Sequence, residues 1–559
     1  MGQTALLARA EQLLQQPDLK GALALYDQAI ASDPKSIDAY LCKARALTTF
    51  QRHEEAMAVI GQLLALQSTF VPALLMRGQS RIALHQYERA FEDFDLAAAL
   101  DPDAKYAQGM ALYLAMRMCR WDDFDAAVSD VSDRVAAGDA VVRAFHFLAM
   151  SASPQLHRKC SEIYFRDTVA QQTATTPKPA ANGKIKLGYF SADFNAHATS
   201  HLIAGLFRAH DRSRFEVIAY SLTHAPADPV QRQMMASVDR WVDISVLSDD
   251  VIASRVRDDG IHIALDLNVY TNRQPGFFAR RVAPIQANYL GFPGTAGADC
   301  YDYVIGDPVV TPIAHAAHFS ERIVMLPHSY QPTDFRALPL PSPPSRTSLN
   351  LPEHGFVFCC FNDSFKITPD VFDIWMNLLR RIRGSTLWLL EPSASAMRNL
   401  RAEARKRGIA EDRLVFAPRA PLQDHIARHA AADLFLDTFH YNAHTTASDA
   451  LWAGLPVLTK CGDTFPSRVA ASLVTAAGIP ELITQTPEAY ERLAEELATQ
   501  PEKLAHVRKQ LADGRLRCPL FDTAGYTRNI EGAYREMWRR YQAGSPLAPI
   551  AIPETPPVP

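Results

Sequence analysis

The 559-residue sequence contains few cysteines, no long run of charges of one sign and no long apolar run. Its eight cysteines are scattered, without a CxxC pair, which is typical of reduced thiols and offers no metal cage. The charges nearly balance, with 57 Lys and Arg against 61 Asp and Glu, so they favour neither nucleic acid nor a membrane surface as a partner. No apolar run approaches the ~20 residues of a membrane-spanning helix. We therefore expect a cytoplasmic, multidomain protein.

Residues 20–130 repeat with a period of 34 residues, which is the period of tetratricopeptide repeats. Ala22, Ala56 and Ala90 occupy one position of the repeat, and the small residues Ala44 and Gly78 occupy another, where the two helices of a unit must approach closely. The pattern predicts an α-helical solenoid over residues 1–150. Its concave surface could hold an extended peptide, although a solenoid without a partner is the simpler alternative.

From residue 184 onward, short β-rich runs alternate with helical stretches, which predicts two α/β lobes with parallel sheets. We expect a connection over 151–183, a first lobe over 184–335, a proline-rich linker over 336–348, a second lobe over 349–544 and a disordered tail over 545–559. The predicted strands are 184–191, 215–220, 261–265, 285–290, 303–305 and 323–325, then 356–361, 386–390, 414–416, 434–436 and 457–458.

The stretch 436–458 is the most informative, because a short apolar strand leads through a polar loop into a helix. His444, Thr445 and Thr446 lie where the helix starts. A helix start leaves about four backbone N–H groups unpaired and carries roughly half a positive charge, so it suits a phosphate without a metal. The alternative is that Thr446 only caps the helix, with Asp449 completing a capping box. The pattern alone leaves both interpretations open.

Three basic residues elsewhere are candidates for a ligand site, since ligands of such sheets bind beyond the carboxyl ends of the strands. Lys366 follows the first strand of the second lobe and could meet a diphosphate as a point charge; an exposed surface lysine is the alternative. His197 follows the first strand of the first lobe, and a metal shared with His201 lacks a third ligand. His262 lies inside a predicted strand, where a core imidazole is the stronger competitor.

Two further groups could line a ligand pocket. His425 and Arg428 are three residues apart and share one helical face, which suits a nucleoside as well as it suits solvent. The loop containing Gly291, Pro293 and Gly294 would let a ligand approach the backbone closely, or would be an ordinary turn.

Seven motifs follow the repeats in a fixed order, and together they make the chain resemble the O-GlcNAc transferases, in particular their bacterial homologues. They are HATSH at 197–201, DGIHI at 259–263, APIQANYLGFPGTAG at 283–297, FNDSFKI at 361–367, APLQDHIARH at 420–429, HTTASDALWAGLPV at 444–457 and SRVAASL at 467–473. The resemblance implies a GT-B pair of Rossmann-like lobes and inverting transfer of GlcNAc from UDP-GlcNAc to Ser or Thr of a polypeptide held along the repeat groove. It implies no metal or other cofactor. The long intervening domain of animal members is absent.

The resemblance also assigns roles to individual residues. Lys366 would hold the diphosphate and stabilise the UDP leaving group, together with His444, Thr445 and Thr446. For the nucleoside, His425 would stack on uracil, Arg428 would contact its edge, Asp449 would bind the ribose and Ala420 would lie in the same pocket. The sugar pocket would be lined by Gly291, Pro293 and Gly294, and the reacting centre would be approached by His197 and His262. The general base could be His197, a donor phosphate oxygen or a water chain.

Two departures from the family pattern bear on donor binding. A lysine usual two residues after Ala420 is Leu422 here, and a position that is often an amide is Asp363. Both changes predict weaker binding of a diphosphate. They also keep open a second function, a repeat scaffold without turnover. A third alternative is a two-lobed epimerase or a UDP-sugar transferase with a small acceptor, although the repeats favour a polypeptide acceptor.

Overall fold

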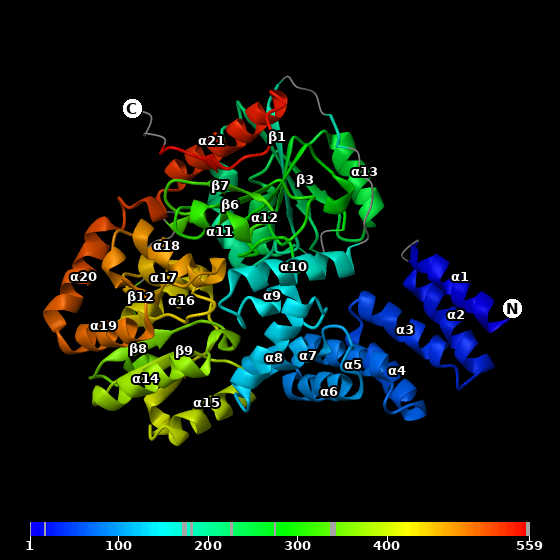
Figure 1. Cartoon of the computed structure of the whole chain (residues 1–559), viewed down its shortest axis with the longest axis horizontal. Helices are drawn as coiled ribbons and strands as arrows, with labels where there is room; N and C mark the ends of the chain where they lie inside the picture. The colour runs from blue at the N-terminus through cyan, green and yellow to red at the C-terminus, as the bar shows by residue number, and fades with distance from the viewer. Residues whose placement is uncertain are drawn as a thin grey trace. The chain divides into compact units, whose positions relative to one another are not determined.

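The computed structural model describes residues 2–15, 18–169, 176–178, 183–223, 227–272, 276–335 and 342–554 (Figure 1). The chain divides into two compact units, Met1–His146 and Phe147–Pro559, and the division falls in the short helix α9 (Ala144–Phe147). Residues 170–175 and 179–182 of the predicted connection (151–183) and residues 336–341 of the predicted linker lie outside the described residues. The remaining boundaries stay predictions.

Helices of the first unit follow the 34-residue period of the sequence. Helices α1, α3 and α5 begin at residues 3, 37 and 71, and α2, α4 and α6 begin at residues 19, 53 and 87. The bounds are α1 (Gln3–Gln15), α2 (Leu19–Ser32), α3 (Ile37–Thr49), α4 (His53–Leu66), α5 (Val71–Ala83), α6 (Tyr87–Leu100), α7 (Ala107–Arg117) and α8 (Phe124–Ala137). The predicted helical solenoid is therefore confirmed.

The small residues of the repeat lie where neighbouring helices touch. Ala44 is fully buried in the core between the repeats, where Tyr40 and Leu74 also pack. A Cβ atom added at Gly78 would lie 2.6 Å from the ring of Phe94 on the next helix, which is closer than packed atoms allow. The close approach expected from sequence thus explains the residue size at these positions.

The second unit contains two parallel sheets, and we call the lobe around the first of them the N lobe. Its eight strands are ordered β14-β7-β6-β5-β4-β1-β2-β3. The bounds are β1 (Ile185–Ser191), β2 (Phe215–Ser221), β3 (Arg240–Asp243), β4 (Ile263–Asp266), β5 (Ile285–Asn288), β6 (Tyr303–Gly306), β7 (Arg322–Met325) and β14 (Ile550–Ala551), with helices α10 (Pro154–Thr168), α11 (Ala198–Ala209), α12 (Pro229–Met235) and α13 (Asp249–Asp259). The prediction missed β3, a four-residue edge strand with a charged residue at each end.

The lobe around the second sheet is the C lobe, whose six strands are ordered β10-β9-β8-β11-β12-β13. Its elements are β8 (Val357–Cys360), α14 (Pro369–Arg381), β9 (Thr386–Leu390), α15 (Ala394–Lys406), β10 (Leu414–Ala417), α16 (Leu422–Arg428), β11 (Leu434–Leu436), α17 (Thr445–Trp452), β12 (Val457–Lys460), α18 (Val469–Ala476), β13 (Ile483–Thr484), α19 (Pro487–Thr499) and α20 (Pro501–Gly514). All five predicted strands are present, and β13 adds a sixth.

The order of the strands fixes where each sheet can bind a ligand. In both lobes the chain first adds strands in one direction and then reverses, so the reversal point lies between β1 and β4 in the N lobe and between β8 and β11 in the C lobe. Loops leaving the carboxyl ends of those strands diverge and leave a crevice. The loops after β8 and β11 carry Lys366 and His444, so the fold brings these two predicted residues to one crevice.

The end of the chain departs from the prediction, because it returns to the N lobe. Helix α21 (Thr523–Gln542) packs against α11, and the hydroxyls of Tyr534 and Tyr189 lie 3.0 Å apart (Figure 1). Strand β14 then pairs with β7, in register Ile550 with Val324. The prediction of a disordered tail from 545 is thus wrong for β14, because the edge of β7 satisfies its backbone groups. Residues 555–559 lie outside the described residues.

Candidate functional site

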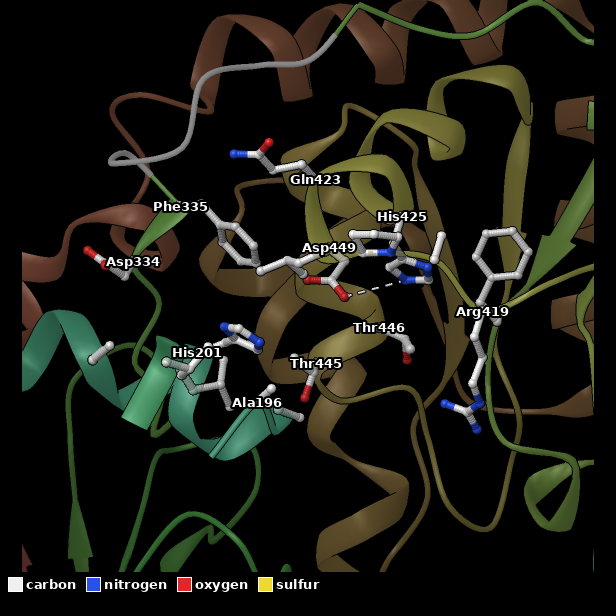
Figure 2. A pocket seen from close by; sticks show the side chains of 18 of the residues that line it. Ala196, His201, Asp334, Phe335, Arg419, Gln423, His425, Thr445, Thr446 and Asp449 are labelled. Carbon is white, nitrogen blue, oxygen red and sulfur yellow. Dashed lines mark ion pairs between the residues drawn. The ribbon is translucent and has the colours of Figure 1, made fainter. Parts of the chain in front are cut away.

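A cleft of about 730 Å³ is lined by residues of both lobes. The N lobe contributes the start of α11 with Ala196, Ala198, His201 and Leu202, and the C lobe contributes the starts of α16 and α17. Figure 2 shows His201 and Ala196 on one side, with Thr445, Thr446, Asp449 and His425 on the other. Thr445, Thr446, Asp449, His425, Arg428 and Ala420 were all predicted as site residues, and all six line this cleft.

The amino end of α17 faces the cleft without a side-chain cap. The helix begins at Thr445, within the predicted start at His444–Thr446, and no side chain in the described part of the chain caps it. The Thr446 hydroxyl donates instead to Asn362 Oδ1 at 2.9 Å. The capping interpretation is therefore wrong, and the first turn retains the backbone donors and partial positive charge that suit an anion.

Two residues missed by the sequence analysis hold the loops of the crevice together. Asn362 is the second residue after β8. Its Nδ2 donates to Thr438 Oγ1 at 2.8 Å, and its Oδ1 accepts from the Thr446 hydroxyl. Asp437, directly after β11, accepts from the backbone N–H of Ala443 at 2.6 Å and from the Thr459 hydroxyl at 2.7 Å. Burial raises the pKa of Asp437 to about 6. The sequence signal that could have identified both residues is a polar side chain within two residues of the end of an apolar strand.

Lys366 lies on a 3-10 turn (Ser364–Lys366) between β8 and α14, and thus follows the first strand of the C lobe as predicted. Its Nζ donates to the carbonyl of Asn442 at 2.9 Å and lies 4.1 Å from the centroid of the Tyr441 ring. Burial lowers the pKa of Lys366 to about 8, against the opposing charges of Asp437 and Asp363. The ammonium group is therefore charged at neutral pH and close to the loop that leads into α17.

His444 is the residue directly before α17. Its ring stacks on Tyr441 with centroids 4.7 Å apart, and its Nε2 lies 3.3 Å from the carbonyl oxygen of Pro466. Burial, followed by the charge of Lys366, holds the pKa of His444 well below its ordinary value. The imidazole is thus neutral beside the lysine, and it can donate a hydrogen bond without adding charge.

His425 and Arg428 share one face of α16, as predicted, and they bond to each other. Arg428 Nη2 lies 2.5 Å from His425 Nδ1, which must therefore accept, so the proton of the neutral ring is on Nε2. Burial lowers the pKa of His425 to about 2. Arg428 also lies 4.5 Å above the ring of Phe361, a cleft residue that the sequence analysis missed. This wall of the cleft presents flat aromatic and guanidinium surfaces.

Asp449 turns a nearly buried carboxyl group into the cleft. Its Oδ2 lies 3.6 Å from His425 Nε2, as the dashed line in Figure 2 marks, and its Oδ1 has no hydrogen-bond partner among the described residues. Burial raises the pKa of Asp449 to about 7. A buried acceptor without a partner is costly, so a ligand hydroxyl at this point would relieve the cost.

His197 and His201, at the start of α11, differ in whether they face the cleft. His197 is the residue before α11, where its Nδ1 accepts from the backbone N–H of Thr199 at 3.3 Å, and 49% of its side chain is exposed. It does not line the cleft described above, whereas His201, one turn later, does. The structure therefore brings His201 to the cleft and leaves the catalytic role of His197 a prediction.

The catalytic prediction for His262 is wrong. His262 precedes β4, and its Nδ1 accepts from the backbone N–H of Lys186 at 2.9 Å near the start of β1. It thus lies at the amino ends of the strands, whereas the cleft lies at their carboxyl ends. Its ring packs edge-on against Trp538 of α21, with centroids 4.5 Å apart. The core imidazole alternative is the correct one.

The loop with Gly291, Pro293 and Gly294 follows β5 and is held by protein contacts. A Cβ atom at Gly291 would lie 1.9 Å from the carbonyl oxygen of Leu267, so the glycine is required by the neighbouring backbone. The carbonyl of Gly294 accepts from Asn288 Nδ2 at 2.8 Å. None of the three residues lines the cleft described here, and their sugar-binding role stays a prediction.

Within the described residues, no three His, Cys, Asp or Glu side chains are placed to share a metal ion. Among the helices of the same residues, none combines the length and the apolar character needed to cross a bilayer.

Known proteins show the same combination of parts. The model of glycosyl transferase family 41 matches residues 163–339 and 343–530, and a tetratricopeptide repeat model matches residues 13–73. The structure of a mutant O-GlcNAc transferase from Thermobaculum terrenum has a TM-score of 0.72 and 25% sequence identity, covering 97% of this chain and 98% of that one. The predicted fold is thus confirmed as tetratricopeptide repeats followed by a GT-B pair of Rossmann-like lobes.

Curated relatives are similar over most of this chain. A probable UDP-N-acetylglucosamine–peptide N-acetylglucosaminyltransferase SEC of Arabidopsis thaliana is 35% identical over 458 residues, covering 78% of this chain and 47% of that protein. A UDP-N-acetylglucosamine–peptide N-acetylglucosaminyltransferase of Caenorhabditis elegans is 27% identical over 559 residues, covering 77% and 49%. The chain spans about half the length of these relatives. By the family model and this similarity, the chain belongs to glycosyl transferase family 41.

Proposed function

We propose that the protein transfers GlcNAc from UDP-GlcNAc to Ser or Thr hydroxyls of polypeptides, with inversion at the anomeric carbon and without a metal ion. The observation that carries the proposal is that the uncapped start of α17 and the unpartnered carboxyl of Asp449 line one cleft, while Lys366, which does not line it, bonds to Asn442 in the loop that leads into α17. These groups match the diphosphate and ribose of a nucleotide sugar. The names of the relatives support the choice of donor and acceptor.

The nucleotide would lie along the C lobe. The base would pack between Ala420 and His425, with Arg428 behind them, and the ribose would donate to Asp449. The diphosphate would then meet the first turn of α17 at Thr445 and Thr446, which line the cleft. Lys366 would move from the carbonyl of Asn442 to a phosphate oxygen, which is a stronger acceptor for an ammonium group.

Transfer would proceed in a single displacement. The acceptor hydroxyl oxygen bonds to the anomeric carbon on the face opposite UDP while the bond from that carbon to the β-phosphate oxygen breaks. The electron pair of the broken bond leaves with UDP, and the hydroxyl proton passes to a base or to water. Lys366 and the start of α17 stabilise the charge that grows on the departing diphosphate. They would supply in this way the charge compensation that a metal provides in other sites.

The identity of the base and the place of the acceptor are finer parts of the proposal. His197 is a candidate base by the family motif, with a donor phosphate oxygen or a water chain as alternatives. A polypeptide acceptor would lie along the concave surface of the repeats, as repeat solenoids present extended surfaces. The absence of a CxxC pair among the eight cysteines supports a cytoplasmic location.

The direct test is incubation of the purified protein with UDP-GlcNAc and a cell lysate in the presence of EDTA. Mass spectrometry should find HexNAc on Ser and Thr of lysate proteins, together with stoichiometric UDP. Label recovered only on a small molecule, or no transfer by a protein that binds UDP, would overturn the proposed acceptor or turnover. Activity that returns only with Mg²⁺ or Mn²⁺ would overturn the metal-free mechanism.

A pH dependence follows from the pKa of Lys366. The pKa is lowered to about 8, so the free protein loses this positive charge as pH rises through 8. Above pH 8 UDP is already fully ionised, because the second pKa of a phosphate group is about 6. Titration calorimetry from pH 7 to 9.5 should therefore show UDP affinity falling by up to about tenfold per pH unit above 8. A flat profile would contradict a contact between Lys366 and the diphosphate.

The carboxylate of Asp363 should weaken donor binding. Its charge raises the pKa of Lys366, which places it near the ammonium group and thus near any bound diphosphate. Asp363→Asn removes a like charge and should lower the Kd for UDP several-fold, in line with exposed or half-buried charge interactions of about 1 kcal/mol. Calorimetry with UDP and with uridine separates the effects, because uridine has no phosphate and should bind both proteins equally. An unchanged Kd for UDP would contradict the prediction.

A further inference from the structure

A buried hydrogen bond joins the N lobe to the helix whose start faces the cleft. Gln331 follows β7 of the N lobe and is 2% exposed, and its Nε2 donates to Ser448 Oγ at 2.5 Å. Ser448 lies on α17 of the C lobe, is fully buried and follows the cleft residue Thr445 by three positions. The bond therefore connects the N lobe directly to the first turns of α17.

Neighbouring contacts make this bond part of a rigid seam between the lobes. Asp307, directly after β6, accepts from the Ser472 hydroxyl of α18 at 2.7 Å and from the backbone N–H of Tyr330 at 2.9 Å. The ring of Tyr330 meets Phe465 edge-on, with centroids 5.1 Å apart. The segment that carries Gln331 is thus hydrogen-bonded to the N lobe and packs against the C lobe. Gln331 has little freedom to follow α17 if the helix moves.

A helix start that binds phosphate on the C lobe is only half of a transfer site. The donor's anomeric carbon must also face groups of the N lobe, and a misplacement of about 1 Å can cost about 10²-fold in rate. We propose that Gln331 is a positioning residue, which sets the place of α17 and its bound diphosphate relative to the N lobe. This inference rests on the proposed transferase function, and it deepens it by separating nucleotide binding from transfer.

Gln331→Met keeps the length of the side chain and removes its hydrogen bonds, and Ser448→Ala removes the partner hydroxyl. Each change should lower kcat for transfer by about tenfold or more, because α17 loses its registration against the N lobe. The Kd for UDP should change less than about threefold, since the nucleotide contacts lie on the C lobe. The double variant should be no slower than the single ones, because both changes remove one interaction.

Thr333→Val is the matched control. The Thr333 hydroxyl donates to the carbonyl of Leu520, so it is also a buried bond between an N lobe segment and the C lobe side, but it does not reach α17. If the contacts between the lobes affect transfer only through stability, Thr333→Val and Gln331→Met should lower Tm and kcat by similar amounts. That result would overturn the positioning role. It is also overturned if the effects of Gln331→Met and Ser448→Ala simply add.

The outcomes separate this inference from the proposed function. Should Gln331→Met fail to fold, Ser448→Ala gives the same test with a smaller change. A wild-type protein that binds UDP and transfers no sugar refutes both the transferase function and this role of Gln331. A wild-type protein that transfers sugar, with kcat of Gln331→Met and Ser448→Ala unchanged, refutes the positioning role alone.

Discussion

Lys366→Met should lower kcat for sugar transfer by about 10²- to 10³-fold, the loss expected when one group that stabilises a developing oxyanion is removed. Lys366 Nζ has a neutral carbonyl as its hydrogen-bond partner, that of Asn442, and lies in the crevice between β8 and β11. The charge on the departing UDP is larger in the transition state than in the bound donor. The variant should therefore lose more in kcat than in UDP affinity, which steady-state kinetics and calorimetry measure together.

Lys460→Met is the matched control for this prediction. Lys460 ends β12 of the same lobe and lies 5.1 Å from the ring centroid of Phe439, but unlike Lys366 it belongs to neither of the loops that follow β8 and β11. The control variant should keep kcat and KM within about twofold of the wild type. Equal losses in the two lysine variants would mean that net charge, and not the position of Lys366, supports the reaction. An active Lys366→Met protein would remove the central group of the proposed mechanism.

The repeats and the parts of the phosphate site were predictable because each depends on local sequence. A 34-residue period fixes the helix starts in the first unit, and Lys366 and His444 each follow an apolar strand within ten residues. Strand order is a different kind of information. That β8 and β11 are neighbours, so that the two loops meet, follows from the packing of the whole sheet and not from the residues of either strand.

The errors have the same origin. His262 was assigned to the reacting centre by its motif, but it directly precedes β4 and therefore lies at the amino ends of the strands, away from the cleft. His201 was weighed only as a metal ligand, although one helical turn decides which imidazole of α11 faces the cleft. The return of α21 and β14 to the N lobe depends on contacts more than 200 residues apart, such as Tyr534 with Tyr189 and β14 with β7. Such long-range contacts have no local signal.

Asp449→Asn should weaken UDP binding and at the same time stabilise the free protein. Asp449 Oδ1 has no hydrogen-bond partner in the described part of the chain, and its neighbour His425 is neutral because its pKa is lowered to about 2. Hydrogen bonds to a charged acceptor contribute about 1.5–3 kcal/mol, so the loss of the ribose contact should raise the Kd for UDP by about 10- to 100-fold. The preference for UDP over its 2′-deoxy analogue should shrink in the variant.

The gain in stability should depend on pH, and its sign follows from the raised pKa. Folding raises the pKa of Asp449 from 3.8 to about 7, so the folded protein holds this proton more tightly than the unfolded one, and stability falls as pH rises between these values. At pH 8 the wild type thus contains a buried carboxylate that Asn replaces with a neutral amide. Tm of the variant should exceed that of the wild type at pH 8, and the difference should diminish toward pH 5. Asp424→Asn, at an exposed position of α16, should change neither Tm nor Kd. A pH-independent difference in Tm would show that Asp449 acts through packing, and the ribose contact would then have to be sought at another cleft residue.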